Sequence, residues 1–234
     1  MPLLNLLRLT TTLNLNSCIC LISNKLNSTN MAIITNHDVG DYLYPSDNPY
    51  DIPCLSLDGQ AGALELPFAP VGAGYKTSRA KTLHFYVDDY RFATVWNNPA
   101  KILNSNIKQV VEVNYSIFQS TPVARGLERI YKKRWLSRYW QNCGLKVYVD
   151  LNVSAKFADF NRLGVPHGYN AFCTRGYRGR LDGLVLEHRI ACEISGLDTP
   201  NLIVYGGGKE IHEYCMKHSL LYVADFITDK NIKQ

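Results

Sequence analysis

Short runs of β-branched and aromatic residues alternate with longer amphipathic or polar stretches along most of the chain. Runs bounded by polar residues predict strands at 83–87, 110–113, 146–149, 171–173, 202–205 and 221–224. The clearest helical spacing covers 122–142, 181–195 and 210–218. Nearly continuous apolar strands separated by crossovers are typical of a parallel sheet with helices on both faces. We therefore predict an α/β fold with a mostly parallel sheet of about six strands and flanking helices, either doubly wound or resembling an incomplete barrel.

Polar or glycine residues follow each predicted strand. In chain order they are Asp88-Asp89, Asn114-Tyr115-Ser116, Asp150-Leu151-Asn152, Thr174-Arg175-Gly176, Gly206-Gly207-Gly208 and Asp225. The carboxyl ends of parallel strands share one edge of the sheet, which is where ligands bind in such folds. Each of these residue types is also common at ordinary caps and turns. Because so many of the strands end in charged groups, we expect a polar cleft along this edge.

Two segments at that edge have the chemistry of an anion site. The glycine run Gly206, Gly207 and Gly208, followed by Lys209, lies between a strand and a helix start, where backbone N–H groups favour an anion. The loop from Arg175 to Arg180 reads Arg-Gly-Tyr-Arg-Gly-Arg. Its guanidinium groups, on Arg175, Arg178 and Arg180, can grip phosphates while the tyrosine stacks on a base. A plain solvated loop is the alternative interpretation.

The long predicted helix over 122–142 carries bases on two sides. Its apolar stripe also contains Arg134 and Arg138, whereas a second group of bases falls roughly opposite. That second group, expected to form a solvated face able to touch phosphates, is Arg125, Arg129, Lys132 and Lys133. An arginine on an apolar face must be paired, either in a structural ion pair or with the anion of a substrate. The carboxylates available to it are Asp88, Asp89, Glu112 and Asp150.

Several catalytic classes are disfavoured by the motifs. The chain has no His-x-His, no His-Glu-x-x-His and no Gly-x-Ser-x-Gly, which disfavours zinc hydrolases, histidine-dependent nickases and α/β-hydrolases. The Asp88-Asp89 pair could hold Mg²⁺, ideally with Asp150 as a third carboxylate. If the chain is an enzyme, the candidate catalytic residues are Asp88, Asp89, Arg91, Arg134, Arg138 and Asp150.

Composition narrows the class of protein. With 234 residues, 46% of them hydrophobic and 19% charged, the chain has the make-up of a globular protein and not of a disordered one. Its net charge of +5 permits a polyanionic partner but does not require one. The sequence predicts no membrane span. Seven cysteines without a Cys-x-x-Cys pair indicate reduced thiols and a cytoplasmic setting.

The amino-terminal part differs from the rest in composition. Residues 1–30 contain no acid, and the first acidic residue of the chain is Asp38. A transit peptide for an organelle matrix, a signal peptide and an overcalled start preceding Met31 are the alternatives, and we favour the last. Residues 31–80 form an irregular lead-in rich in Pro and Gly, with a candidate short strand at 64–68 and a loop at 72–77. Residues 81–234 are expected to form one α/β domain.

Distinctive blocks of the sequence resemble a known family. The blocks are His84-Phe85-Tyr86-Val87-Asp88-Asp89-Tyr90-Arg91-Phe92, Val95-Trp96-Asn97-Asn98-Pro99, Arg134-Trp135-Leu136 with Tyr139-Trp140, Gly144-Leu145-Lys146-Val147, and Ile203-Val204-Tyr205-Gly206. Over roughly residues 50–225 the chain resembles the bacterial, archaeal and phage family called domain of unknown function 4417. The matched positions are Asp88, Asp89, Arg91, Trp96, Asn97, Asn98, Arg134, Trp140, Thr174, Gly176, Tyr205 and Gly206.

That resemblance implies a phage or small-plasmid genomic setting but no established activity. The chain departs from the family where the family tends to read Ser-Pro-Asp-Phe-Ser, because it has Val113-Asn114-Tyr115-Ser116 there. A mechanism that needed the aspartate would therefore not transfer to this chain.

Two functions follow as hypotheses. The first is a nucleic-acid-associated protein of a mobile element, a phage or plasmid, that binds DNA in replication or maintenance. The second is an enzyme that processes a nucleotide or phosphate ligand at the carboxyl edge, with the Asp88-Asp89 pair on metal and Gly206 to Gly208 around phosphate. A scaffold protein without chemistry is also compatible with the sequence.

Overall fold

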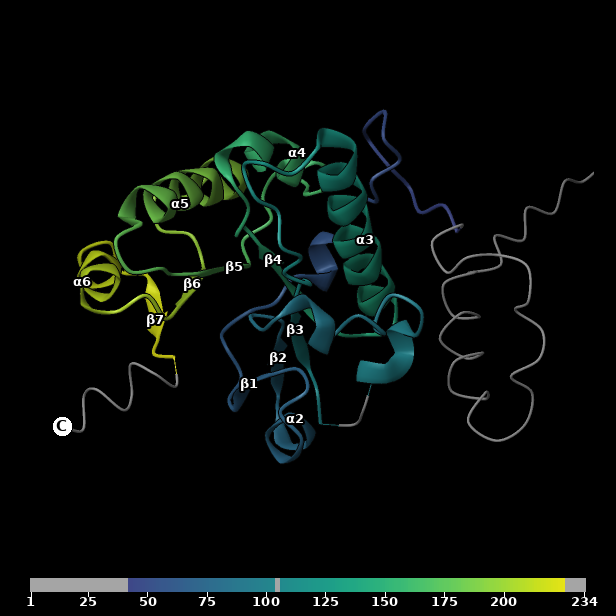
Figure 1. Cartoon of the computed structure of the whole chain (residues 1–234), viewed down its shortest axis with the longest axis horizontal. Coiled ribbons are helices and arrows are strands. Elements are labelled where there is room, and N and C mark those ends of the chain that lie inside the picture. Colours follow the sequence, from purple (N-terminus) through teal and green to yellow (C-terminus); the bar gives the residue numbers. More distant parts are fainter. Residues whose placement is uncertain (1–41, 104–105, 226–234) are drawn as a thin grey trace, which may run out of the picture. The chain divides into compact units, whose positions relative to one another are not determined.

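The computed structural model of the chain describes residues 42–103 and 106–225 (Figure 1). All described residues belong to one compact unit of the chain. The expectations for residues 1–30 therefore lie outside the described residues.

A parallel sheet of seven strands organises the described part of the chain. All its neighbouring strands are parallel. The strands are β1 (Phe68–Pro70), β2 (Thr82–His84), β3 (Gln109–Val111), β4 (Lys146–Asp150), β5 (Phe172–Arg175), β6 (Leu202–Tyr205) and β7 (Leu221–Val223). The predicted α/β fold is confirmed, and each of the six predicted strands is present. The additional strand, β1, starts where the candidate strand at 64–68 was expected to end.

The order of the strands decides between the two predicted architectures. The strands lie in the sheet in the order of the sequence, from β1 to β7. A doubly wound sheet requires a point where this order reverses, and there is none here. The sheet is therefore a curled half-barrel, which confirms the incomplete-barrel alternative. Figure 1 shows the strands along an arc, with helices on its outer side.

An α-helix lies in each crossover between successive strands except the one from β2 to β3, which contains two short 3-10 helices, Asp89–Arg91 and Pro99–Ile102. The α-helices are α2 (Tyr75–Arg79), α3 (Val123–Asn142), α4 (Ala158–Arg162), α5 (Leu181–Ser195) and α6 (Lys209–Lys217). Right-handed crossovers between strands in sequential order place helices on one face, so the expectation of helices on both faces was wrong. Helix α2 overlaps the segment at 72–77 that was expected to be a loop. No helix in the described ranges is long and apolar enough to cross a membrane.

The buried stripe of α3 differs in phase from the predicted one. Its fully buried positions include Gly126, Ile130, Lys133, Ser137 and Trp140, which recur at three- and four-residue intervals. A Cβ atom at Gly126 would lie 2.1 Å from the ring of Phe157, so only glycine allows this close contact. Lys133, expected on the solvated face, is consequently buried.

The inner face of the half-barrel is lined by aromatic side chains. Phe68 of β1 stacks on His84 of β2, with ring centroids 4.4 Å apart. Tyr205 of β6 lies 4.7 Å from His84 and 5.8 Å from Tyr86, so side chains from distant strands meet on the concave side. This packing fixes the curvature of the sheet and brings the loops after the strands toward one another.

Candidate functional site at the carboxyl edge of the sheet

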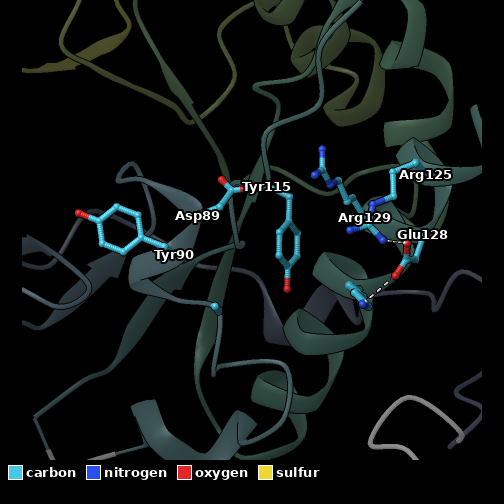
Figure 2. A pocket seen from close by; sticks show the side chains of 8 residues that line it. Asp89, Tyr90, Tyr115, Arg125, Glu128 and Arg129 are labelled. Carbon is cyan, nitrogen blue, oxygen red and sulfur yellow. Dashed lines mark hydrogen bonds and ion pairs between the residues drawn. The ribbon is translucent and has the colours of Figure 1, made fainter. Parts of the chain in front are cut away.

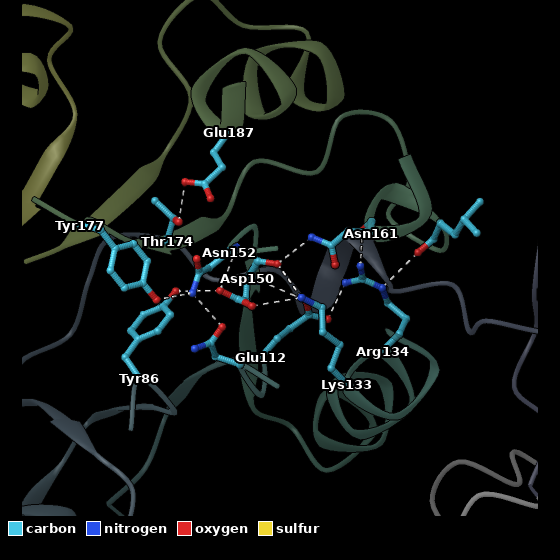
Figure 3. Close-up of polar contacts among 12 residues, drawn as sticks. Tyr86, Glu112, Lys133, Arg134, Asp150, Asn152, Asn161, Thr174, Tyr177 and Glu187 are labelled. Atoms are coloured by element: carbon cyan, nitrogen blue, oxygen red, sulfur yellow. Dashed lines mark hydrogen bonds and ion pairs between the residues drawn. The ribbon is translucent and has the colours of Figure 1, made fainter. Parts of the chain in front are cut away.

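Asp150, the last residue of β4, is the centre of a buried polar network at the carboxyl edge (Figure 3). The ammonium group of Lys133 donates to the Asp150 carbonyl at 2.8 Å and to Asp150 Oδ2 at 3.1 Å. Tyr86 donates its hydroxyl to Asp150 Oδ1 at 3.1 Å. Burial raises the pKa of the Asp150 carboxyl, and the neighbouring Lys133 ammonium opposes that effect. The pair joins α3 to β4.

A second ion pair extends this network beneath the edge. Arg134 donates to the carboxylate of Glu112, which directly follows β3, and both side chains are fully buried. The other guanidinium nitrogens of Arg134 donate to the carbonyls of Leu163 at 3.1 Å and Asn161 at 2.7 Å. Glu112 Oε2 also accepts the backbone N–H of Asp150 at 3.1 Å. Protein groups thus occupy every nitrogen of Arg134, so its geometry favours a structural ion pair over a substrate clamp.

Above this buried layer, amide and phenol groups link three loops at the edge. Asn152, after β4, donates its side-chain amide to Asn114 Oδ1 at 3.0 Å and to the Tyr177 hydroxyl at 3.2 Å. Asn114 follows β3 and Tyr177 follows β5. The three side chains are half-buried or exposed, so this relay lies at the surface where a ligand can reach it. The expected polar edge is therefore formed by loops that contact one another.

The arginine-rich loop after β5 and the glycine run after β6 are in direct backbone contact. The N–H of Gly176 donates to the carbonyl of Tyr205 at 3.0 Å. A Cβ atom at Gly176 would lie 2.4 Å from the carbonyl oxygen of Gly206, and one at Gly207 would lie 2.8 Å from the Gly176 carbonyl carbon. Gly206, Gly207 and Gly208 all have positive φ, which leads the chain from β6 into the start of α6. The two predicted anion-binding segments are thus neighbours.

The side chains of the arginine-rich loop gather around Tyr177. The guanidinium carbons of Arg175 and Arg180 lie 5.6 Å and 5.7 Å from the centre of its ring. Arg175 also donates to the carbonyl of Tyr86 at 3.0 Å, which connects the loop to the far side of the half-barrel. Arg178 and Arg180 are exposed, and so is Lys209 at the start of α6. The loop therefore offers an exposed aromatic ring beside several positive charges.

Two titratable side chains behind the edge have perturbed pKa values. Glu187 of α5 accepts a hydrogen bond from the Thr174 hydroxyl at 2.7 Å, and burial raises the pKa of Glu187 to about 8. Burial lowers the pKa of His84 to about 3, with a further contribution from the charge of Arg175. Near neutral pH His84 is therefore uncharged, and Glu187 is largely protonated.

The Asp88-Asp89 pair lies in the loop after β2. Asp88 is exposed, whereas Asp89 accepts hydrogen bonds from the Ser116 hydroxyl at 2.9 Å and from the Ser116 N–H at 3.2 Å. Asp89 also lines a pocket of about 280 Å³ between this loop, the loop after β3 and α3 (Figure 2). Arg91 is exposed, and its guanidinium lies 5.8 Å from the ring centre of Tyr90.

The three aspartates proposed as magnesium ligands do not form one site. Asp150 is bound by Lys133 and Tyr86, while Asp89 is bound by Ser116. Within residues 42–103 and 106–225, no group of three His, Cys, Asp or Glu side chains is placed to hold a metal ion. Among the described residues, no carboxylate forms an ion pair with Arg138. A magnesium site at Asp88 and Asp89 alone remains a prediction.

Sequence reasoning missed several residues of the edge. Lys133 was placed on the solvated face, and Tyr86 and Asn152 were not selected as site residues. Asn152 does stand among the residues that directly follow the strands, and that position is the signal that could have identified it. Tyr177 was expected to stack on a base, but its contact with Asn152 was not predicted. Lys133 carries no such signal, because its stripe contains a glycine and a serine in place of large apolar residues.

Comparisons with known proteins identify a matching family and two related phage proteins. The model of the family described as Domain of unknown function (DUF4417) matches residues 44–224. The Gene 1 protein of Mycobacterium phage L5 is 33% identical over 170 residues, which cover 70% of this chain and 74% of the phage protein. The Gene 1 protein of Mycobacterium phage D29 is 31% identical over 205 residues, covering 82% of this chain and 72% of its own length. No solved structure matches the chain.

Proposed function

We propose that this chain, which belongs to the family described as Domain of unknown function (DUF4417), is a nucleic-acid-associated protein of a mobile genetic element. In this proposal it binds phosphates and bases along the carboxyl edge of the half-barrel and serves the replication or maintenance of a phage or plasmid genome. The observation that carries the proposal is the backbone contact between the arginine-rich loop at 175–180 and the glycine run at 206–208.

That contact supports phosphate binding because two kinds of anion donor converge on one surface. Exposed guanidinium groups supply charge and paired N–H donors, and the glycine run leads into the amino terminus of α6, a nine-residue helix. The first N–H groups of a helix have no partner within it, so they attract negative charge. Successive phosphates of a nucleic-acid strand can therefore contact the loop at 175–180 and the amino terminus of α6 at the same time.

Tyr177 adds the means to bind a base. Its side chain is 37% exposed, and its hydroxyl is held by Asn152 at 3.2 Å, which limits the ring's freedom to turn. A tyrosine ring next to arginines is a common stacking platform in proteins that bind single strands without strict sequence preference. The same ring could not reach a base inside a stacked duplex, so the proposal favours single-stranded DNA or RNA.

The genomic setting supports the biological part of the proposal. Both Gene 1 relatives are encoded by mycobacteriophages, and each aligns over more than two thirds of its own length. Proteins carried by phage genomes often act on nucleic acids, since copying, protecting and packaging a genome are the main tasks of such elements.

The alternative of a metal-dependent nucleotide-processing enzyme has less support. Asp150, which would ideally be the third carboxylate beside the Asp88-Asp89 pair, is instead paired with Lys133 in the buried layer. The pocket beside Asp89 is the part of the edge that keeps this alternative open. Adding Mg²⁺ to the binding assay tests it, because cleavage of the strand would reveal catalysis.

The direct test measures binding of the purified full chain to a fluorescently labelled single-stranded 12-mer and to its duplex, by fluorescence anisotropy at rising salt. We expect the single strand to bind more tightly and the affinity to fall steeply with salt. Arg178→Ala/Arg180→Ala removes two exposed charges from the loop and should weaken binding by about tenfold or more.

The matched control is Lys108→Ala/Lys217→Ala, which removes two exposed charges at other places. Lys108 directly precedes β3, at the amino edge of the sheet, and Lys217 is the last residue of α6. This variant should bind like the wild type. Equal weakening by both double variants would show that net charge alone is responsible, and an absence of binding near physiological salt would refute the proposal.

A further inference from the structure

The pocket between α3 and the loops after β2 and β3 has a mixed lining suited to a ligand with several kinds of group. Its volume is about 280 Å³, close to the lower end of the range, roughly 300 Å³ upward, typical of small-molecule sites. A duplex cannot enter a pocket of this size, whereas one nucleotide can. The polar and aromatic side chains of its lining are Asp89, Tyr90, Tyr115, Arg125, Glu128, Arg129 and Lys132.

The basic side of this pocket has more positive than negative charge. Glu128 forms ion pairs with both Arg125, three residues before it, and Lys132, four residues after it. One carboxylate therefore neutralises part of the charge of two bases. Arg129 donates to the carbonyl of Ser116 instead of a carboxylate. With three bases against Glu128 and Asp89, the lining has an unneutralised guanidinium charge at Arg129, and this charge can bind a phosphate.

The opposite side of the pocket presents an acceptor and an aromatic ring. Figure 2 shows Tyr115 between Asp89 and the side chains of α3. Asp89 is anchored by two hydrogen bonds from Ser116, at 2.9 Å and 3.2 Å, so its position is fixed. An anchored carboxylate accepts hydrogen bonds from hydroxyl or amino groups and repels phosphate, so it separates the two ends of a bound ligand.

Tyrosines at the pocket offer surfaces for a flat ring. Tyr115 is half-buried and packs edge-on against Phe92, with centroids 5.6 Å apart, so its own orientation is fixed. Tyr90 is 72% exposed at the rim, and its ring points away from Tyr115 in Figure 2. A base can pack on either ring without desolvating a buried charge.

We infer that this pocket binds a nucleoside phosphate. Its phosphate pairs with Arg129, its base packs beside the tyrosines, and a sugar hydroxyl or base amino group donates to Asp89. The inference rests on the proposed function, because it makes the pocket the place that holds one nucleotide of a bound strand. A free nucleotide has the same chemistry, and the experiment separates the two sources.

The pocket is connected to the arginine-rich loop along the edge. Tyr115 follows Asn114 in the chain, Asn114 accepts a hydrogen bond from Asn152, and Asn152 donates to Tyr177. The loops after β2, β3, β4 and β5 therefore form a continuous surface. A single strand can lie on this surface with one nucleotide in the pocket and others on the loop at 175–180.

Isothermal titration calorimetry with deoxyadenosine monophosphate measures binding of a nucleotide to the pocket. Fluorescence anisotropy with the single-stranded 12-mer measures binding of the nucleic-acid strand. Arg129→Gln should weaken both by at least about fivefold, while Arg178→Ala/Arg180→Ala should weaken only the strand. Arg189→Gln, at an exposed position of α5, is the matched control and should change neither. Inorganic phosphate should compete poorly, because it lacks the base.

Because Arg129 also contacts Ser116, circular dichroism must show that Arg129→Gln is folded. Tyr90→Ala, at an exposed position, provides a second variant that should weaken strand binding. If Arg129→Gln loses affinity for the mononucleotide but keeps its affinity for the 12-mer, the pocket binds free nucleotides and not a nucleotide of the strand. Unchanged binding of both ligands by Arg129→Gln and Tyr90→Ala, or full competition by inorganic phosphate, overturns the inference and leaves the proposed function intact. If the wild type binds the mononucleotide but no strand, the proposed function fails and the pocket stands.

Discussion

Lys133 binds Asp150 at two points, with its ammonium nitrogen 2.8 Å from the backbone oxygen and 3.1 Å from Oδ2. Both side chains are buried to about 1% exposure. The contact fastens the middle of α3 to the carboxyl end of β4, so the helix that lines the pocket is held against the strand that begins the Asn152 relay. The buried ion pair is therefore the part of the fold that positions the candidate site.

Lys133→Met should destabilise the protein by about 3–5 kcal/mol, because it leaves Asp150 buried without its partner. Chemical denaturation with urea measures the change in the free energy of unfolding. Lys217→Met, at an exposed position, should stay within about 0.5 kcal/mol of the wild type. The double change Lys133→Met/Asp150→Asn should recover part of the loss, since it removes both charges. If the double change lowers the free energy of unfolding by the sum of the effects of Lys133→Met and Asp150→Asn measured separately, the two residues are not a coupled pair.

Glu187 should make the protein less stable as the pH rises. The folded protein ionises this carboxyl near pH 8, whereas the unfolded chain ionises it near its ordinary value of 4.5. Between these values the unfolded state binds fewer protons, so the contribution of Glu187 to stability falls as pH increases. Glu187→Gln keeps an acceptor for Thr174 and should be stabilising by a few kcal/mol at pH 8 and nearly neutral at pH 4.5. Unfolding curves of both proteins across this range check the prediction, which a pH-independent difference would contradict.

Gly207→Ala should disturb the contact between the two loops. Its φ is +100° and a Cβ would lie 2.8 Å from the Gly176 carbonyl carbon, so the change strains the backbone and separates the loops. We expect a destabilisation of about 1–3 kcal/mol and weaker binding of the 12-mer. Gly183→Ala in α5, where a Cβ meets nothing within 4 Å, should instead be neutral or stabilising. Thermal denaturation and anisotropy on both variants test the prediction, and wild-type behaviour of Gly207→Ala would contradict it.

Tyr177 should contribute to binding through its ring. Tyr177→Leu removes the stacking surface and should weaken single-strand affinity by about fivefold or more. Tyr177→Phe keeps the ring and loses only the hydrogen bond from Asn152, so its affinity should stay within about threefold of the wild type. Anisotropy with the same 12-mer compares them. Equal effects of the two changes would show that the hydroxyl contact, and not stacking, is what matters.

Strand positions could be predicted because the central strands are short, apolar and almost entirely buried. β1 was harder to predict, because Phe68-Ala69-Pro70 is only three residues long and contains a proline, which a sheet tolerates at its edge. The sequential strand order could not be chosen from the pattern alone, since doubly wound and barrel-like sheets have the same alternation of strand and helix. Strand order depends on which strands pair, and that is settled by long-range packing.

The edge itself could be predicted, but its internal arrangement could not. The arginine-rich loop and the glycine run were identified because strand ends carry ligand groups in parallel sheets. Their mutual contact depends on Gly176 and Gly207 allowing two backbones to meet, which no local pattern reveals. Lys133 was misplaced because Gly126 and Ser137, which lie on the same buried stripe, are not large apolar residues and so do not mark that stripe in the sequence.

The salt dependence of single-strand binding tests the central claim most directly. The logarithm of the association constant is plotted against the logarithm of salt concentration for the wild type, Arg178→Ala/Arg180→Ala and Lys108→Ala/Lys217→Ala. Each phosphate contact with a single strand contributes about 0.7 to the slope, so losing both arginines should flatten it by about 1.4. The lysine control should keep the wild-type slope. A wild-type slope in the arginine variant, or no measurable strand binding by the wild type, would contradict a nucleic-acid surface at the carboxyl edge.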